Sequence, residues 1–198
     1  MPTSFITNFL QSTIKQFTYY KMLGDKTFDQ LVDEDLFWQS PSENNSIAII
    51  VNHLHGNMQS RWTNFLTTDG EKDFRNRDQE FENLIKTRSE LIANWSEGWQ
   101  TLFTALDSVD EENFDQLVYI RNQGHTIVEA INRQLAHYAY HVGQIVLIGQ
   151  MRRGKDWQSL SIPKGKSKIY NEKKFGQEKK RGHFTDEFLA YIPIFFYL

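Results

Sequence analysis

Residues 127–151, IVEAINRQLAHYAYHVGQIVLIGQM, carry the pattern on which the fold prediction depends. Apolar side chains recur there at three- and four-residue steps, the period of one face of an α-helix. Thr126, with Glu129 three residues later, forms a capping-box pattern at the start, and Gly154 follows the last periodic residue. We therefore expect one long amphipathic helix. Its apolar face holds Ile127, Ile131, Leu135, Tyr138, Val142, Ile145 and Ile148.

Three earlier stretches show the same spacing of apolar side chains. The first starts at Phe5, with Gly24 just beyond it as the expected stop; the second spans about residues 47–65 and the third about residues 80–106. Before the last helix, residues 118–124 join β-branched side chains to an Asn-Gln-Gly turn signal, which predicts a short extended arm or hairpin. Four such helices predict an all-α fold, an antiparallel four-helix bundle.

The composition is that of a chain that folds around one core. Of the 198 residues (23.4 kDa), 39% are hydrophobic and 14% aromatic, which excludes a disordered or fibrous protein. We expect a bundle domain over residues 1–155 and a loop-rich extension over residues 156–198. The sequence has no cysteine, which excludes disulfides and a protein thiol nucleophile and fits a reducing cytoplasm. The first residues lack the cationic start and apolar run of a secretory signal, so we expect a cytoplasmic protein.

The extension is basic although the whole chain is slightly acidic. Residues 152–181 hold 11 of the 22 Lys and Arg residues and three acidic residues, a local charge of +8. Because the net charge of the whole chain is −3, the remaining residues together carry −11. Such a segment can bind nucleic acid or an acidic lipid surface, or it can dock on the acidic body of its own chain. We favour self-docking or a solvated segment over nucleic-acid binding, because the segment matches no nucleic-acid motif.

The longest apolar run lies at the C-terminal end of the extension. Residues 188–198 contain Pro193 and fall short of the roughly 20 residues that a membrane-spanning helix needs. We expect this run to pack on the bundle or on a dimer partner, and we expect no membrane anchor.

The histidines are the residues best suited to chemistry. His137 and His141 lie four apart on one helix face, within reach of a common metal ion, although such pairs also occur as solvated or hydrogen-bonded residues. His53 falls in an inward-facing part of the second helix, and bundles build metal sites from facing helices. His55 is about 200° around the helix from His53, so we place it at the surface. His125 belongs to the entry of the last helix and His183 to the C-terminal extension.

Two motifs resemble a known superfamily. Residues 52–54 (NHL), together with residues 137–144 (HYAYHVGQ), resemble the DinB/YfiT-like four-helix-bundle metalloproteins, which carry one His in helix two and an H-x-x-x-H-x-G-Q segment late in the bundle. Residues 52–58 and 67–72 further resemble a subfamily of uncharacterised bacterial proteins, over roughly the first 155 residues. The resemblance implies that His53, His137 and His141 are the ligands of one divalent ion, with water in the remaining positions. Val142 departs from the Arg that often precedes Gly-Gln, which leaves the ligands intact.

The resemblance also implies a range of activities. Characterised relatives include transferases and isomerases that use low-molecular-weight thiols, and others are described as metal-dependent hydrolases. We expect a metal-dependent transferase or hydrolase of a small molecule, and a homodimer. Imidazole ligands alone do not select one metal, and among the ions that they suit we favour Zn or Ni. The alternative is a non-catalytic stress or interaction protein that keeps the ion for stability. Three amides are candidates to orient an imidazole or a bound water, or are ordinary polar helix residues: Asn57, Gln134 and Gln144.

Overall fold

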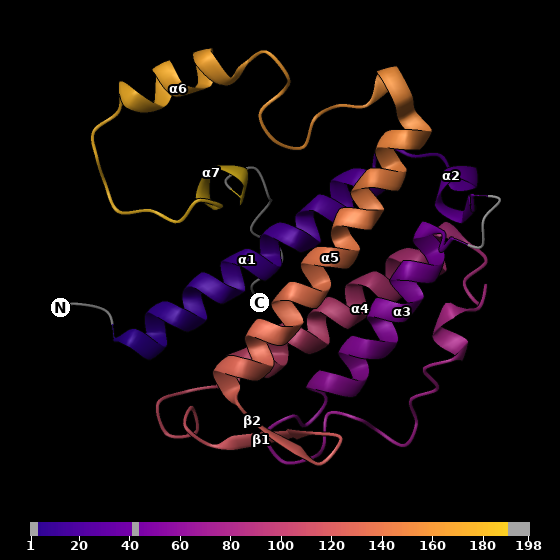
Figure 1. Ribbon diagram of the computed structural model, residues 1–198, viewed down its shortest axis with the longest axis vertical. Helices are drawn as coiled ribbons and strands as arrows, with labels where there is room; N and C mark the ends of the chain where they lie inside the picture. Colours follow the sequence, from indigo (N-terminus) through magenta and orange to yellow (C-terminus); the bar gives the residue numbers. More distant parts are fainter. Residues whose placement is uncertain (1–3, 41–43, 190–198) are drawn as a thin grey trace.

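Four long helices pack around one apolar core in this computed structural model, which describes residues 4–40 and 44–189 (Figure 1). Helix α3 packs mainly on α4, and α1 on α5. The centre of the core is formed by side chains with no solvent exposure, among them Phe17, Trp99 and Tyr138. The protein is mostly helical, as the apolar periodicity predicts. The long helices are α1 (Phe5–Phe28), α3 (Ile47–Trp62), α4 (Arg88–Asp107) and α5 (Ile127–Arg153).

Each long helix begins at a hydroxyl side chain that accepts a hydrogen bond from a backbone N–H in the first turn. Glu129 completes the capping box predicted at the start of α5, because its carboxylate accepts from the backbone N–H of Thr126 at 2.8 Å. Gly154 ends α5 with φ at +55°, a left-handed conformation that favours glycine. The four caps are Ser4, Ser46, Thr87 and Thr126.

Three predicted helix boundaries are wrong. Gly24 does not end the first helix: α1 continues to Phe28, and Gly24 is the point where α1 approaches α4, since a Cβ there would lie 2.3 Å from the Trp95 ring. The second helix ends at Trp62, because Thr63 is extended with ψ of 118°, and Asn64 follows with φ of +50°. The third begins at Arg88, not near residue 80, because the capping box of Thr87 fixes its start.

The predicted arm between α4 and α5 is a β-hairpin. Strand β1 (Leu117–Ile120) pairs antiparallel with β2 (Gln123–Thr126), and the two turn residues, Arg121 and Asn122, have φ of +56° and +59°. Such left-handed pairs are typical of tight hairpin turns. The carboxylate of Asp69 accepts hydrogen bonds from the backbone N–H groups of both turn residues, at 2.8 Å each, so the hairpin is tied to the connector that follows α3.

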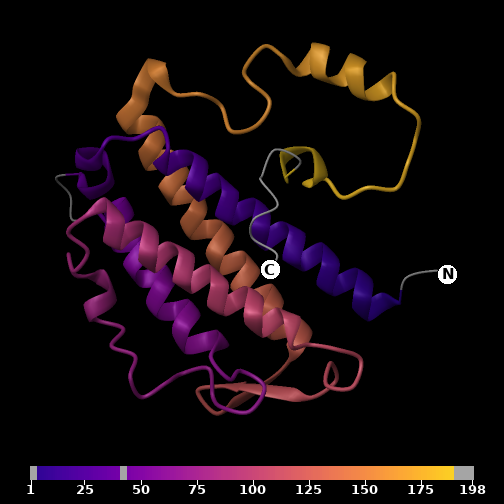
Figure 2. The same cartoon turned by 180° about the vertical axis from the view of Figure 1, so that it is seen from behind.

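Short helices complete the described chain: α2 (Asp33–Phe37), the 3-10 turns η1 (Gln79–Phe81) and η2 (Gly154–Asp156), α6 (Ser167–Phe175) and α7 (Asp186–Leu189). Helix α6 buries no residue and stands apart from the four long helices, whereas the segment around α7 contacts α1 (Figures 1 and 2). Lys15 of α1 pairs with Asp186 at 2.6 Å, and Ser12 lies 3.0 Å from the His183 ring. Residues 190–198, most of the apolar run, lie outside the described residues.

None of the described helices is long and apolar enough to cross a membrane.

Candidate metal centre

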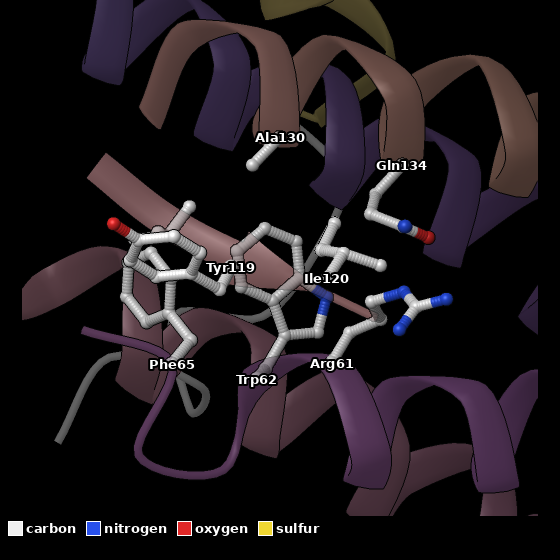
Figure 3. Close-up of a pocket in the computed structure, with 8 residues that line it drawn as sticks. Arg61, Trp62, Phe65, Tyr119, Ile120, Ala130 and Gln134 are labelled. Atoms are coloured by element: carbon white, nitrogen blue, oxygen red, sulfur yellow. The ribbon is translucent and has the colours of Figure 1, made fainter. Parts of the chain in front are cut away.

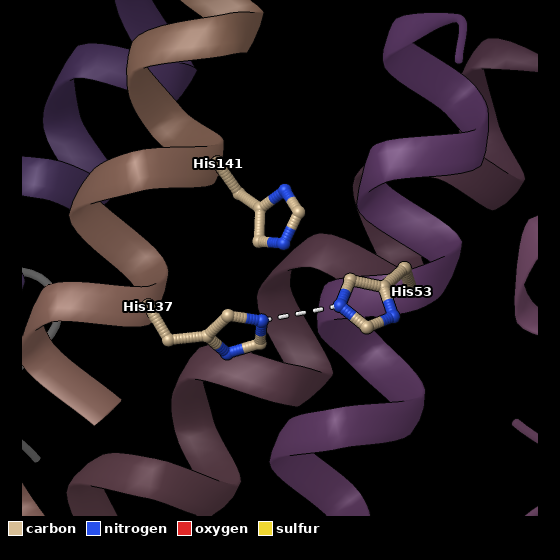
Figure 4. Close-up of side chains that lie close together, drawn as sticks. All are labelled: His53, His137 and His141. Atoms are coloured by element: carbon tan, nitrogen blue, oxygen red, sulfur yellow. Dashed lines mark hydrogen bonds between the residues drawn. The ribbon is translucent and has the colours of Figure 1, made fainter. Parts of the chain in front are cut away.

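Three imidazole rings meet between α3 and α5. His53 extends from α3, and His137 and His141 extend from consecutive turns of α5 toward it (Figure 4). One ring nitrogen of each histidine lies within 4.8 Å of the other two, and the Nε2 atoms of His53 and His137 are 3.2 Å apart. His53 and His141 are buried and His137 is half-buried. The structure therefore brings together the three histidines that the sequence singles out, and the cluster could hold a metal ion.

The apolar pattern of the two helices explains why the rings meet. Leu54, next to His53, and Tyr138 and Val142, next to His137 and His141, have 1% solvent exposure or less. Burial of these neighbours fixes how each helix is rotated about its axis, because a side chain one position away on a helix points only about 100° away. The histidines thus lie at the edge of the stripes that form the core, on the sides of α3 and α5 that face each other.

Burial keeps the rings of α5 neutral. The pKa of His137 is lowered to about 3, first by desolvation and then by charge repulsion from the nearby His141, His53, Arg75 and Arg61. Desolvation also lowers the pKa of His141, although its hydrogen bond to Gln144 opposes the shift. A metal binds the deprotonated imidazole. At neutral pH these two side chains are already in the form that a metal requires.

A buried carboxylate supports His53 from behind. Glu80, in η1, places Oε2 2.9 Å from His53 Nδ1, and Arg75 donates to both oxygens of Glu80, at 2.7 and 3.0 Å. Burial raises the pKa of Glu80, but the hydrogen bonds from His53 and Arg75 outweigh it and leave the pKa below its usual value. Sequence reasoning missed Glu80, since 27 residues separate it from His53 and the apolar spacing placed it at the start of the third predicted helix, which begins at Arg88.

The three candidate amides have different surroundings. Gln144 lies at the cluster, where its Oε1 accepts from His141 Nδ1 at 2.8 Å, so Nε2 is the nitrogen of His141 left for a ligand. Asn57 instead accepts from the Tyr138 hydroxyl at 3.0 Å. Gln134 is buried and its Oε1 has no hydrogen-bond partner among the described residues. Of the three, Gln144 is the one with a hydrogen bond to a histidine of the cluster among the described residues.

Gln134 borders a small cavity under the hairpin (Figure 3). The cavity has a volume of about 10 Å³, close to that of one water probe. Arg61, whose Nε is also buried and has no partner among the described residues, lines it beside Trp62. A single water in this cavity could bridge the Arg61 Nε donor and the Gln134 Oε1 acceptor. The cavity is too small for a substrate.

The remaining histidines lie apart from the cluster. His55 is half-buried and its Nε2 is 3.1 Å from a carboxylate oxygen of Glu97 on α4. His125 is in β2, just before α5, and His183 contacts Ser12 and Thr185 in the C-terminal extension. Their positions agree with the sequence reading, except that His55 is less exposed than expected.

Comparison with known proteins identifies a family but no activity. Residues 4–166 match a family described as "Protein of unknown function (DUF1572)". No curated protein and no solved structure matches the chain. Because the match spans most of the sequence, this chain belongs to the DUF1572 family.

Proposed function

We propose that this protein is a metal-dependent enzyme whose site holds one divalent ion between His53, His137 and His141. The observation that supports the proposal is the convergence of three imidazole nitrogens, from two helices, within 4.8 Å. Nitrogen ligands of a tetrahedral zinc ion lie roughly 3.3 Å from one another, and the Nε2 atoms of His53 and His137 are 3.2 Å apart. An all-imidazole donor set suits Zn or Ni, which we favour, as well as Fe or Cu.

The donor set also favours chemistry at the site. Three protein ligands leave at least one position for a substrate, and an ion held in this way polarises a bound group or lowers the pKa of a bound water or thiol. His137, the half-buried member, lies on the side of the cluster nearest solvent. We propose a small-molecule substrate and a transferase or hydrolase reaction. Because the chain has no cysteine, a thiol-dependent reaction needs a low-molecular-weight thiol as cofactor.

A non-catalytic role is the second candidate, and the buried side chains that hold His53 in place favour it. The Glu80 and Arg75 side chains that hold His53 are 6% and 2% exposed, so an ion in the cluster would join α5 to a buried part of the connector after α3. In a stress or interaction protein of this kind, loss of the ion lowers the stability of the fold and changes no substrate reaction.

Elemental analysis of the purified, untagged protein tests the metal site. The variants are His53→Ala and His137→Ala, with His55→Ala as a matched control, since His55 lies on the same helix and outside the cluster. Circular dichroism checks the fold of each. We expect about one metal ion per chain in the wild type and the control, and almost none in the two cluster variants. A wild type that takes up neither Zn²⁺ nor Ni²⁺ would overturn the proposal.

The proposal includes an architecture and a setting. We propose that residues 1–155 form an antiparallel four-helix bundle of the DinB/YfiT type, on the resemblance of the NHL and HYAYHVGQ motifs, and that the protein is a cytoplasmic homodimer. The extension, residues 156–198, packs on the bundle or on the dimer partner; the contacts of Lys15 and Ser12 with the segment around α7 favour the bundle. Light scattering after size exclusion, which gives the mass in solution, distinguishes a dimer from a 23.4 kDa monomer.

A further inference from the structure

A line of buried polar and charged groups leads from the histidine cluster into the connector between α3 and α4. His53 Nδ1 meets Glu80 Oε2 at 2.9 Å, and Arg75 holds the same carboxylate through Nε and Nη2. The side chains of His53, Glu80 and Arg75 are 6%, 6% and 2% exposed. Burying charge is costly unless each group is paired and hydrogen-bonded, and here both carboxylate oxygens are.

This contact determines which nitrogen of His53 faces the cluster. An ionised carboxylate only accepts hydrogen bonds, so in the neutral imidazole that a metal requires, Nδ1 of His53 is the atom that donates a hydrogen bond to Glu80. The lone pair is then on Nε2, the atom that points to His137 (Figure 4). A rotated ring, or the other tautomer, loses the hydrogen bond to Glu80 inside the protein.

Several neighbours hold Glu80 where His53 requires it. The Asn52 side chain, next to His53 on α3, donates to the backbone carbonyls of Gln79 and Glu80 at 3.3 and 3.0 Å. The absence of a side chain at Gly56 makes room, since a Cβ there would lie 2.5 Å from Glu80 Oε1. Phe81 stacks on the His53 ring with the centroids 4.7 Å apart. The backbone of η1, the carboxylate of Glu80 and the ring of Phe81 thus all contact His53 or its neighbour Asn52 and hold η1 against α3.

We propose that Glu80, clamped by Arg75, is the positioning residue of the metal site: it fixes the tautomer and the orientation of His53 and so raises the affinity of the cluster for a divalent cation. The inference rests on the proposed function, because it concerns the same site. Carboxylates that hold a metal-binding histidine in this way are worth about 10- to 100-fold in metal affinity or activity.

The test is the Zn²⁺ affinity of protein stripped of metal, measured by competition with a chromophoric chelator. Glu80→Gln keeps the shape of the side chain and removes its charge. Asp35→Asn is the matched control: Asp35 is also buried and ion-paired, to Arg152 at 2.6 Å, and its pair contacts no histidine of the cluster. We expect about 10- to 100-fold weaker binding for Glu80→Gln and less than threefold change for Asp35→Asn. Equal affinity in Glu80→Gln and the wild type would overturn the inference and leave the three-histidine site standing.

A second readout needs no metal. Long-range ¹H–¹⁵N spectra of the metal-free protein report which nitrogen of each imidazole carries the proton. We expect His53 to be protonated at Nδ1 in the wild type and to show a mixture of tautomers in Glu80→Gln. Should Glu80→Gln fail to fold, Arg75→Lys, which keeps the charge and loses the two-pronged clamp, replaces it in both measurements with the same expected direction. A wild type that binds no Zn²⁺ refutes the proposed function, whereas a His53 tautomer with the proton on Nε2 refutes the role of Glu80.

Discussion

The Nε2 atoms of His53 and His137 face each other at 3.2 Å across the interface of α3 and α5. Two lone pairs at this distance repel, so a proton or a cation has to lie between them. Glu80 accepts a hydrogen bond from His53 Nδ1, so in the neutral ring His53 Nε2 carries the lone pair and, without an ion, His137 Nε2 has to donate to it. Burial and the neighbouring charges, which lower the pKa of His137 to about 3, oppose a second proton there. A divalent ion in place of that one shared proton would accept the lone pairs of both nitrogens.

Zinc should stabilise the folded protein through this cluster. A ligand that binds only the native state at a hundredfold excess over its Kd adds about 2.7 kcal/mol to the free energy of unfolding. For a chain of this size that corresponds to a rise in Tm of roughly 5–11 °C. Differential scanning fluorimetry with Zn²⁺ measures the shift, and an excess of chelator should reverse it. The same shift in the double variant His137→Ala, His141→Ala would place the stabilising ion elsewhere.

Two helical glycines should respond in opposite ways to replacement by alanine. In Gly24→Ala, the new Cβ would lie 2.3 Å from a Trp95 ring carbon, so α1 and α4 have to move apart, and we expect a loss of about 1–3 kcal/mol in chemical denaturation. Gly143 is exposed on α5 with nothing within 4 Å of an added Cβ. There the better helix propensity of alanine should add about 0.5–1 kcal/mol. A gain in stability at Gly24 would mean that α1 and α4 are not this close.

The contrast between Gly24 and Gly143 shows what the sequence can predict here. Apolar periodicity is a local signal, so it located the helices and the spacing of His137 and His141. The role of Gly24 depends on Trp95, 71 positions away, and no pattern near Gly24 distinguishes a close helix contact from a helix stop. Glu80 was missed for the same reason. Its importance comes from contacts with His53 and Arg75 that exist only once the connector has folded, and the sequence places it at the start of a predicted helix.

Asp69 should make stability depend on acid pH. Burial raises the pKa of Asp69, but backbone N–H groups of Asn122, Glu71 and Arg121 donate to the carboxylate and hold its pKa below the usual value. The native state therefore binds this proton less readily than the unfolded chain, so the stabilisation is present above about pH 4 and is lost as the pH falls through the lowered pKa.

Urea denaturation at several pH values measures this effect. We expect Asp69→Asn to lose about 1–2 kcal/mol at pH 7, for the charged hydrogen bonds removed, and the difference from wild type to shrink below pH 4. Asp73→Asn, an exposed acid in the same connector, is the control and should follow the wild type at every pH. A constant gap between Asp69→Asn and the wild type down to acid pH would show that the charge of Asp69 is not what ties the hairpin to the connector.

The Tyr138 hydroxyl should matter for the stability of the core beside the cluster. It accepts from Trp62 Nε1 at 2.9 Å and donates to Asn57 Oδ1 at 3.0 Å, and complete burial raises the pKa of Tyr138 above its usual value. Tyr138→Phe removes the oxygen and leaves a buried indole N–H and a buried amide oxygen unpaired, which costs about 1–3 kcal/mol. Tyr140→Phe, two residues along α5 and exposed, should change stability by less than about 0.5 kcal/mol. Equal stability of the two variants in urea would mean that water replaces the hydroxyl. Because Tyr138 contacts Asn57 and not the ring nitrogens, the Zn²⁺ affinity of folded Tyr138→Phe should stay close to that of the wild type.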